Sequence, residues 1–289
     1  MEIGKRVVLK VSGEALKGKL SINMEKLYEL MNKNIRYTLY DLKMDDIPES
    51  EILNLIAMPS NIDEEMLEIV CNGAKYLHDG DKEVIIVPGA GNFWRGRQKN
   101  SNMDAVLADQ IGMLGINMNA MSIGEKLQRM GVPTRVVSQI PVEEFGVEYN
   151  EINQGRKYLD NGEILIIGGG TGSPLCTSDS ATIKAAHEYS ADTILFGKSI
   201  DGIYDKDPKK HKDARKYKYL TYEKLIEDQI NLGVTSQGVM DFEAMARLLK
   251  NPIDLIAYQA NDNEAIKRIL QGEDIGTTIT KKVKKPMFY

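Results

Sequence analysis

Several short runs of the chain are almost entirely apolar, and longer stretches with helical periodicity separate them. The runs lie at 6–11, 83–87, 134–137, 163–167, 193–196 and 254–258 and are rich in Val, Ile and Leu. They do not alternate strictly between apolar and polar residues, which is typical of strands buried on both faces of a parallel sheet. Helices are predicted between them at 63–77, 106–130, 180–190, 222–232 and 241–249. This order predicts an α/β fold, a three-layer α/β/α sandwich with a mostly parallel central sheet.

One segment near the N-terminus breaks this rhythm. A length of 289 residues fits about two domains or one large α/β domain, and we predict a single domain over 1–289. Residues 19–59 are interpreted as an insertion, with an amphipathic helix at 25–35 and an acidic stretch at 41–51. A peripheral helical insertion and an oligomer contact or regulatory element both remain open. The short basic tail at 281–289 is interpreted as a solvated segment.

The charged residues nearly balance, which limits the possible partners. The chain has 37 Lys and Arg residues against 42 Asp and Glu residues, a net charge of −5. Because nucleic-acid-binding domains are usually strongly basic, we expect no nucleic-acid partner. A local basic pocket for a phosphorylated small molecule remains compatible with this balance. With 42% hydrophobic and 27% charged residues, the composition is also too ordinary for a globally disordered chain.

Cysteine and histidine usage excludes several kinds of site. Cys71 and Cys176 are too few for a disulfide framework and have no zinc-ligand spacing. The three histidines are scattered. The first residues lack the apolar core of a signal peptide, and no run reaches about 18 apolar residues. We therefore expect a cytoplasmic protein without a membrane partner.

The most informative residues lie where predicted strands end. Lys10-Val-Ser-Gly13 closes the first strand, a glycine loop starting at Gly89 follows the second, and another starting at Gly168 follows the strand at 163–167. In open parallel sheets, ligands bind at the carboxyl ends of strands. Glycine lets backbone N–H groups approach an anion, and a following helix N-terminus favours phosphate. Three such loops predict a polyanionic ligand or a pair of phosphorylated ligands.

Two common nucleotide-binding motifs fail here. The Gly197-Lys-Ser199 segment resembles the end of a P-loop, but Asp192 occupies the position of its first glycine. The Gly89-x-Gly91 segment resembles a dinucleotide fingerprint, but Trp94 occupies the third glycine position. Neither motif therefore accounts for the glycine loops.

The charged residues near the loops suit phosphoryl transfer. Lys10 and Arg95 could neutralise phosphate oxygens, and Asp179 stands at the start of a helix. Each has an ordinary alternative, because Lys10 could be a strand-end charge and Asp179 a helix N-cap. The segments Asp201-Gly202 and Asp205-Lys-Asp207-Pro208 could simply form turns. Phosphoryl transfer requires little covalent chemistry from the protein. It needs cations, backbone amides and one or two aspartates, and this chain supplies all of them.

These segments together resemble the amino-acid-kinase superfamily, and within it the bacterial-type uridylate (UMP) kinases. The resemblance covers nearly the whole chain apart from 19–59 and the basic tail. It rests on segments at 10–16, 89–96, 108–113, 170–181, 201–208 and 276–279, in this order. It implies that ATP and UMP react to give ADP and UDP, with Mg²⁺ held mainly by ATP oxygens and waters rather than by a protein metal site. It also implies a homohexamer tuned by GTP and UTP.

The resemblance also implies roles for individual residues. The catalytic groups are Lys10, Arg95 and Asp179. The ATP-binding residues are Lys10, Val11, Ser12, Gly13, Gly91, Arg95, Lys198, Tyr204 and Asp207. The UMP-binding residues are Ala90, Asp109, Thr171, Gly172, Ser173, Pro174, Leu175, Cys176, Thr177 and Ser178, with Asp109 accepting hydroxyl groups of the UMP ribose.

Three positions depart from the family's usual pattern. Ala90 replaces the middle glycine of the second loop, Ser173 stands where an asparagine is usual, and Phe196 stands where a lysine is frequent. Lys198, two residues further on, is a candidate to supply the missing charge. The departures at Ala90 and Phe196 keep open a nucleotide-binding regulator that has lost catalysis. A related small-molecule kinase acting on a carboxylate is the other alternative, although the acid at Asp109 suits ribose hydroxyls better.

Overall fold

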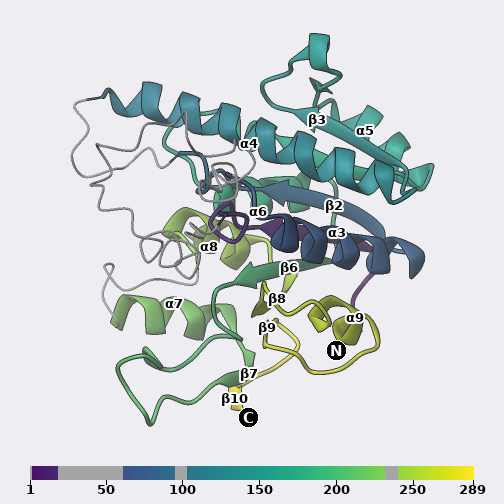
Figure 1. Ribbon diagram of the computed structural model, residues 1–289. Helices are drawn as coiled ribbons and strands as arrows, with labels where there is room; N and C mark the ends of the chain where they lie inside the picture. The colour runs from purple at the N-terminus through teal and green to yellow at the C-terminus, as the bar shows by residue number, and fades with distance from the viewer. Residues whose placement is uncertain (1, 19–60, 95–102, 232–239) are drawn as a thin grey trace, which may run out of the picture.

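The computed structural model describes residues 2–18, 61–94, 103–231 and 240–289. A single sheet runs through this part of the chain, in the order β10-β7-β9-β8-β6-β1-β2-β5-β3-β4 (Figure 1). Its strands are β1 (Arg6–Val11), β2 (Glu83–Pro88), β3 (Thr134–Ser138), β4 (Glu148–Tyr149), β5 (Ile164–Gly168), β6 (Thr193–Lys198), β7 (Tyr217–Leu220), β8 (Asp254–Gln259), β9 (Thr277–Ile279) and β10 (Met287–Phe288).

The centre of the sheet is parallel and one end is mixed. Strands β8, β6, β1, β2, β5, β3 and β4 all run in the same direction. Beyond β8, β9 is antiparallel to β8, β7 is parallel to β9, and β10 is antiparallel to β7. The carboxyl ends of β1, β2, β5 and β6 therefore meet at one edge of the sheet, where the predicted loops begin.

Helices cover both faces of the sheet. They are α3 (Glu64–Asp79), α4 (Ala105–Arg129), α5 (Ile152–Asp160), α6 (Ser178–Glu188), α7 (Tyr222–Asn231), α8 (Phe242–Lys250) and α9 (Ala265–Leu270). Two separate cores form because successive strand residues point to opposite faces. Val7 and Leu9 of β1 pack with α3, α4 and α9, whereas Val8 packs with α5, α6, α7 and α8. The three-layer α/β/α sandwich is thus confirmed (Figure 1).

Most predicted elements are present, and the missed ones are short. Each predicted strand and helix within the described residues is found with its ends shifted by two residues or fewer. The prediction missed α5 and α9, and it missed the strands β4, β7, β9 and β10, which have two to four residues each. The insertion at 19–59, including the predicted helix at 25–35, lies outside the described residues.

The basic tail is only partly the solvated segment that its composition predicts. Its lysines are exposed. The chain then adds β10 to the edge of the sheet, where the Phe288 ring stacks on Tyr217 at 4.4 Å between centroids. The Tyr289 hydroxyl donates to the carbonyl oxygens of Asp274 and Gly276 at 2.9 Å each. The aromatic residues Phe288 and Tyr289 therefore anchor the tail, a role that its high lysine content does not predict.

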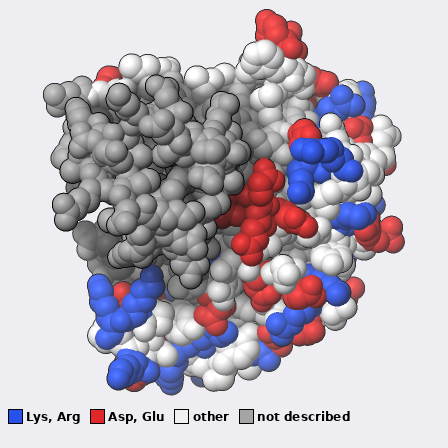
Figure 2. All heavy atoms as spheres, in the orientation of Figure 1, with Lys and Arg blue, Asp and Glu red and all other residues white. Residues whose placement is uncertain are grey.

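The surface shows mixed charge. On the face drawn in Figure 2, acidic side chains gather near the middle, and Lys and Arg side chains elsewhere are interspersed with Asp and Glu. Among the described residues on this face no continuous basic stripe forms. None of the helices that the structure describes is long and apolar enough to cross a membrane.

Candidate active site

The first two glycine loops touch each other at the carboxyl edge of the sheet. A Cβ atom on Gly13 would lie 2.2 Å from the backbone nitrogen of Gly91 and 2.7 Å from that of Ala90. A Cβ atom on Gly89 would lie 3.2 Å from both the Gly13 nitrogen and the Ser178 hydroxyl oxygen. Glycine is therefore required for the close approach, and the N-terminus of α6 joins the same cluster.

Two buried asparagines hold the second loop in place. Asn92 and Asn119 exchange side-chain hydrogen bonds of 2.9 and 2.8 Å, and the Asn119 amide also donates to the carbonyl oxygen of Gly89 at 2.6 Å. The Ala90 methyl group packs against Gly115 of α4. A Cβ atom on Gly115 would lie only 3.1 Å from the Ala90 methyl carbon. Gly115 therefore leaves room for the methyl group that departs from the family pattern. Arg95 lies outside the described residues.

Lys10 and Asp179 form a largely buried ion pair. The Lys10 Nζ atom lies 3.1 Å from Oδ1 of Asp179, and their side chains are 7% and 17% exposed. Lys10 is the last residue but one of β1, and Asp179 is the acidic residue in the first turn of α6. Thr177, not Asp179, is the N-cap of α6, so the carboxylate of Asp179 is available to pair with Lys10. Both residues are thereby brought to one position despite their separation in sequence.

Lys198 lies next to this pair. Its pKa is lowered to about 8 mainly by burial, while the negative charge of Asp179 raises it and the positive charge of Lys10 lowers it further. The Nζ atoms of Lys10 and Lys198 lie 4.7 and 5.1 Å from the ring centroid of Phe196. The chain therefore places a second ammonium group beside Lys10 although position 196 is not a lysine.

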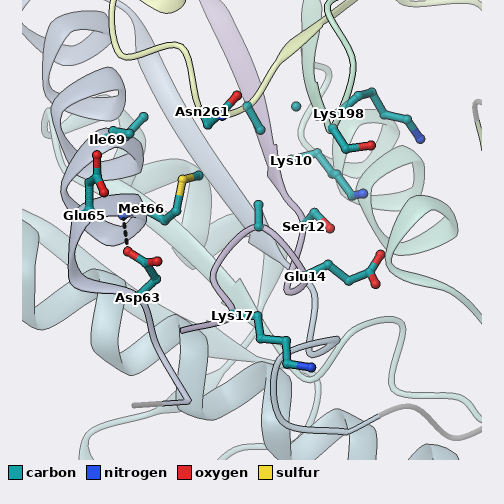
Figure 3. A pocket seen from close by; sticks show the side chains of 14 residues that line it. Lys10, Ser12, Glu14, Lys17, Asp63, Glu65, Met66, Ile69, Lys198 and Asn261 are labelled. Carbon is teal, nitrogen blue, oxygen red and sulfur yellow. Dashed lines mark hydrogen bonds between the residues drawn. The ribbon is translucent and has the colours of Figure 1, made fainter. Parts of the chain in front are cut away.

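A cavity of about 410 Å³ opens at this position. Figure 3 shows Lys10, Ser12 and Lys198 on one side and the α3 residues Glu65, Met66 and Ile69 facing them across the space. Its lining residues are Lys10, Ser12, Glu14, Ala15, Lys17, Asp63, Glu65, Met66, Ile69, Gly197, Lys198, Ser199, Ala260 and Asn261. A cation-lined end next to glycine amides can hold phosphate groups. The sequence interpretation missed the wall formed by α3.

Among the described residues, five of those predicted to bind ATP do not line this cavity: Val11, Gly13, Gly91, Tyr204 and Asp207. The Tyr204 hydroxyl donates to Oδ1 of Asp201 at 2.7 Å, and Asp201 also pairs with Lys216 at 2.9 Å. Asp207 accepts a hydrogen bond from the backbone N–H of Lys209 at 2.9 Å, as in an Asx turn. Val11 is buried in the core with α3. The turn interpretation accounts for Asp207 in this structure.

The predicted UMP loop, from Thr171 to Ser178, is tied to α4 by Asp109. Oδ2 of Asp109 accepts a hydrogen bond of 2.7 Å from the backbone N–H of Leu175. Leu175 has a φ of 63°, a left-handed conformation that is uncommon for a leucine. The hydrogen bond therefore holds a strained backbone position at the middle of the loop.

The rest of this loop is shaped by short-range contacts. The Thr171 hydroxyl donates to the Ser173 carbonyl at 3.0 Å, and Lys184 of α6 donates to the Thr171 carbonyl at 3.1 Å. Gly172 has a φ of 75°, and a Cβ there would lie 2.9 Å from the Gln139 side chain. Pro174, Cys176 and Ser178 are half-buried, and Cys176 is a free thiol.

Asp241 supports the end of the loop and was missed by the sequence interpretation. It accepts hydrogen bonds from the hydroxyl groups of Thr177 and Ser180. It also accepts from the backbone N–H of Ala244 at 2.8 Å and so caps α8. One carboxylate therefore joins the N-termini of α6 and α8. The only sequence signal was that Asp241 begins the predicted helix at 241–249, whereas in the structure it is the N-cap of α8.

Replacing Asp241 with alanine tests this junction. We expect Asp241→Ala to lower the free energy of unfolding by about 2 kcal/mol, because one helix cap and two hydroxyl contacts are lost. We also expect weaker binding of the ligand held by the 171–178 loop. Chemical denaturation and equilibrium binding measure the two effects. Glu151→Ala removes the N-cap of α5 alone, so it should lower stability without changing binding. Unchanged binding in Asp241→Ala would contradict the support role.

The side chains of the site indicate how it could accommodate a magnesium ion. Among the described residues, no group of three or more His, Cys, Asp or Glu side chains could hold a metal ion. The charges that β1 and β6 present to the cavity are the ammonium groups of Lys10 and Lys198, which repel a free cation and attract phosphates. The residues present therefore fit a magnesium ion that arrives on nucleotide phosphates.

Comparison with known proteins places this geometry in a family. The model of the amino acid kinase family matches residues 5–256. The chain belongs to the amino acid kinase family. Its relatives include the uridylate kinase of Limosilactobacillus reuteri, 36% identical over 220 residues, which is 75% of this chain and 88% of the relative. The uridylate kinase of Deinococcus radiodurans is 34% identical over 204 residues, 70% of this chain and 80% of the relative.

Solved structures of this family share the whole fold. The UMP kinase from Bacillus anthracis superposes with a TM-score of 0.79 at 26% identity and covers 100% of both chains. The UMP kinase from Ureaplasma parvum has a TM-score of 0.74 at 28% identity, covering 96% of this chain and 99% of its own. The amino acid kinase fold that the resemblance implied is thereby confirmed.

Proposed function

We propose that this protein is a UMP kinase, which transfers the γ-phosphoryl group of ATP to UMP. The observation that carries the proposal is the buried Lys10–Asp179 pair at 3.1 Å, where the glycine loops after β1 and β2 meet the N-terminus of α6. Relatives named uridylate kinases at 34% and 36% identity support the choice of UMP as acceptor. An oxygen of the UMP phosphate forms a new bond to the γ-phosphorus of ATP. The bond between the γ-phosphorus and the β–γ bridging oxygen breaks, and ADP leaves with that oxygen.

The proposed roles follow from charge and position. Lys10 and Lys198 neutralise the oxygens of the migrating phosphoryl group, and the loop amides near Gly13 and Gly91 donate to them. Asp179 accepts from the Lys10 ammonium group and thereby orients it. Arg95 is proposed for the same phosphoryl group from the sequence alone. When bound with ATP, Mg²⁺ would supply further charge neutralisation on the phosphates.

The acceptor nucleotide is proposed to lie against the 171–178 loop and α4. Asp109 is already in contact with this loop through Leu175, which places its carboxylate at the loop's surface. A carboxylate there suits hydroxyl donors and disfavours an anionic carboxylate substrate. This argues against the related small-molecule kinase that the sequence kept open.

A coupled assay of ADP release tests the function. The protein is given ATP and magnesium with UMP, CMP, AMP or small carboxylates as acceptors. We expect turnover with UMP far above that with the other acceptors. Nucleotide binding without turnover would instead indicate a regulator, and turnover on a carboxylate would indicate a different kinase of this fold. Heat-denatured protein and ATP without acceptor are the controls.

A substitution at Asp109 tests the acceptor site. We expect Asp109→Asn to raise the KM for UMP about tenfold to a hundredfold, because hydrogen bonds to a charged group are worth about 1.5–3 kcal/mol. The KM for ATP should change less than twofold, since Asp109 does not line the cavity at Lys10. Steady-state kinetics with each substrate varied in turn gives both constants. Equal changes in both would reject the assignment of Asp109 to the acceptor.

Assembly and regulation are proposed from the resemblance. The resemblance to bacterial-type UMP kinases implies that the protein forms a homohexamer in the cytoplasm and responds to GTP and UTP as effectors. Light scattering gives the mass of the assembly with and without GTP. A monomeric mass in both conditions would reject the hexamer.

A further inference from the structure

Two ammonium groups share one aromatic ring at the proposed phosphoryl site. β1 and β6 are parallel neighbours in which Lys10 is paired with Phe196. Because residues two apart on a strand share a face, Lys198 is on the same side of the sheet as Phe196. Their Nζ atoms lie 4.7 Å (Lys10) and 5.1 Å (Lys198) from the ring centroid. Both distances are within the range of a cation–π interaction, about 6 Å.

The two ammonium groups beside the Phe196 ring repel each other. Lys10 and Lys198 carry like charges, and Asp179 is the acid that pairs with Lys10 at 3.1 Å. Phe196 is completely buried, Lys10 is buried and Lys198 is half-buried, so the ring face meets the two ammonium groups where they are partly shielded from water. The negative face of a ring attracts cations more strongly when they are desolvated. The ring therefore offsets part of the repulsion and part of the burial cost of the second ammonium group.

We propose that Phe196 is a positioning residue for phosphoryl transfer, whose ring face holds Lys198 in its charged form beside Lys10. The proposal rests on the proposed function, because it assigns both ammonium groups to the phosphates of ATP. It also bears on position 196, where the resemblance leads us to expect a lysine, since Lys198 supplies an ammonium group on the same face. Leucine or methionine would fill the same core volume without this attraction.

The groups that influence Lys198 come from several elements. Lys10 faces it from β1 and Asp179 from α6. Tyr258 of β8 has its hydroxyl beside Gly197, and burial raises its pKa, so it stays neutral. The other charged residues that line the same cavity are Glu14, Lys17, Asp63 and Glu65. Since the pKa of Lys198 is lowered to about 8, its charge is lost as the pH rises through about 8.

Fluorinated phenylalanine at position 196 tests the proposal without changing the shape of the core. Stepwise fluorination weakens the negative ring face and leaves the ring in place. The alkaline limb of kcat/KM for ATP reports ionisations of the free enzyme. We expect trifluorophenylalanine to move this limb by about half a pH unit to lower pH, and monofluorophenylalanine less. Trifluorophenylalanine in place of the exposed Phe145 is the control, and it should leave the alkaline limb of kcat/KM unchanged.

A second readout does not depend on turnover. NMR titration of lysines labelled at Nζ, assigned with Lys198→Gln, follows the Lys198 ammonium group directly. A downward shift of both the limb and the titration supports the proposal. A titration unmoved by fluorination overturns it, and so does a Phe196→Leu variant whose limb and titration match those of the unsubstituted protein. If the unsubstituted protein does not phosphorylate UMP but the titration shifts, the proposed function fails while the ring's hold on Lys198 stands.

Discussion

Replacing Lys10 with methionine is expected to lower kcat for UMP phosphorylation about a thousandfold. Methionine keeps most of the side-chain volume but removes the ammonium group, which lies 3.1 Å from Asp179. Because phosphoryl transfer depends on positive groups at the transferred oxygens, a lost donor costs about 10²–10³ in rate in comparable sites. The ADP-release assay measures the change, and the KM for UMP should change little.

Lys17→Met is the matched control for this experiment. Lys17 also lines the cavity, but it is exposed and lies away from Lys10 (Figure 3). We expect it to keep kcat within about threefold, because an exposed, solvated charge contributes little. A Lys10→Met variant that keeps more than a tenth of the activity would remove Lys10 from the mechanism.

Loss of stability must be separated from loss of chemistry in Lys10→Met. Removing one partner of a buried ion pair leaves the other charge uncompensated, which costs about 3–5 kcal/mol when both are buried. The double variant with Asp179→Asn removes the second charge as well. It should recover thermal stability without recovering turnover. If stability and turnover recovered together, the single variant's defect would be one of folding.

The strand ends could be predicted from sequence because their signals are local. The run at 6–11 is apolar up to Lys10, so both the strand and the position of the charge follow from the pattern. The same holds for the glycines after β2 and β5, whose loops begin where the apolar runs stop. The parallel sheet then brings these ends together, so Lys10 and Asp179 could be expected at the same edge of the sheet. The ion pair between them comes from the structure.

The contacts that complete the site are not local and could not be predicted in this way. Asp241 meets Thr177 across 64 residues, and Asp109 meets Leu175 across 66. Nothing in the sequence around Asp241 distinguishes it from a surface acid or a helix cap. The resemblance singled out Asp109 but gave no sign of its contact with Leu175. Phe196 shows the same limit, because an apolar residue at a strand end is typical of a core. Its role depends on which cations the neighbouring strand brings onto its ring.

Replacing Gly13 with alanine is expected to abolish the contact between the first two loops. The added Cβ would lie 2.2 Å from the Gly91 nitrogen and 2.7 Å from the Ala90 nitrogen, both backbone atoms that cannot rotate away. Overpacking of this kind costs about 1–3 kcal/mol or more, and we expect the free energy of unfolding to fall by at least that amount. Because the loops must separate by about 1 Å, kcat should fall about a hundredfold or more.

Gly112→Ala separates this clash from the general effect of replacing a glycine. Gly112 lies inside α4, where a Cβ would meet Trp94 Cδ1 at an ordinary 3.7 Å. Alanine there should leave activity unchanged and add up to about 1 kcal/mol of stability, because glycine is unfavourable in a helix. Urea denaturation and the ADP-release assay on both variants complete the comparison. If Gly13→Ala folded and turned over like Gly112→Ala, the two loops would have room between them, and the close approach that assembles the phosphate site would be wrong.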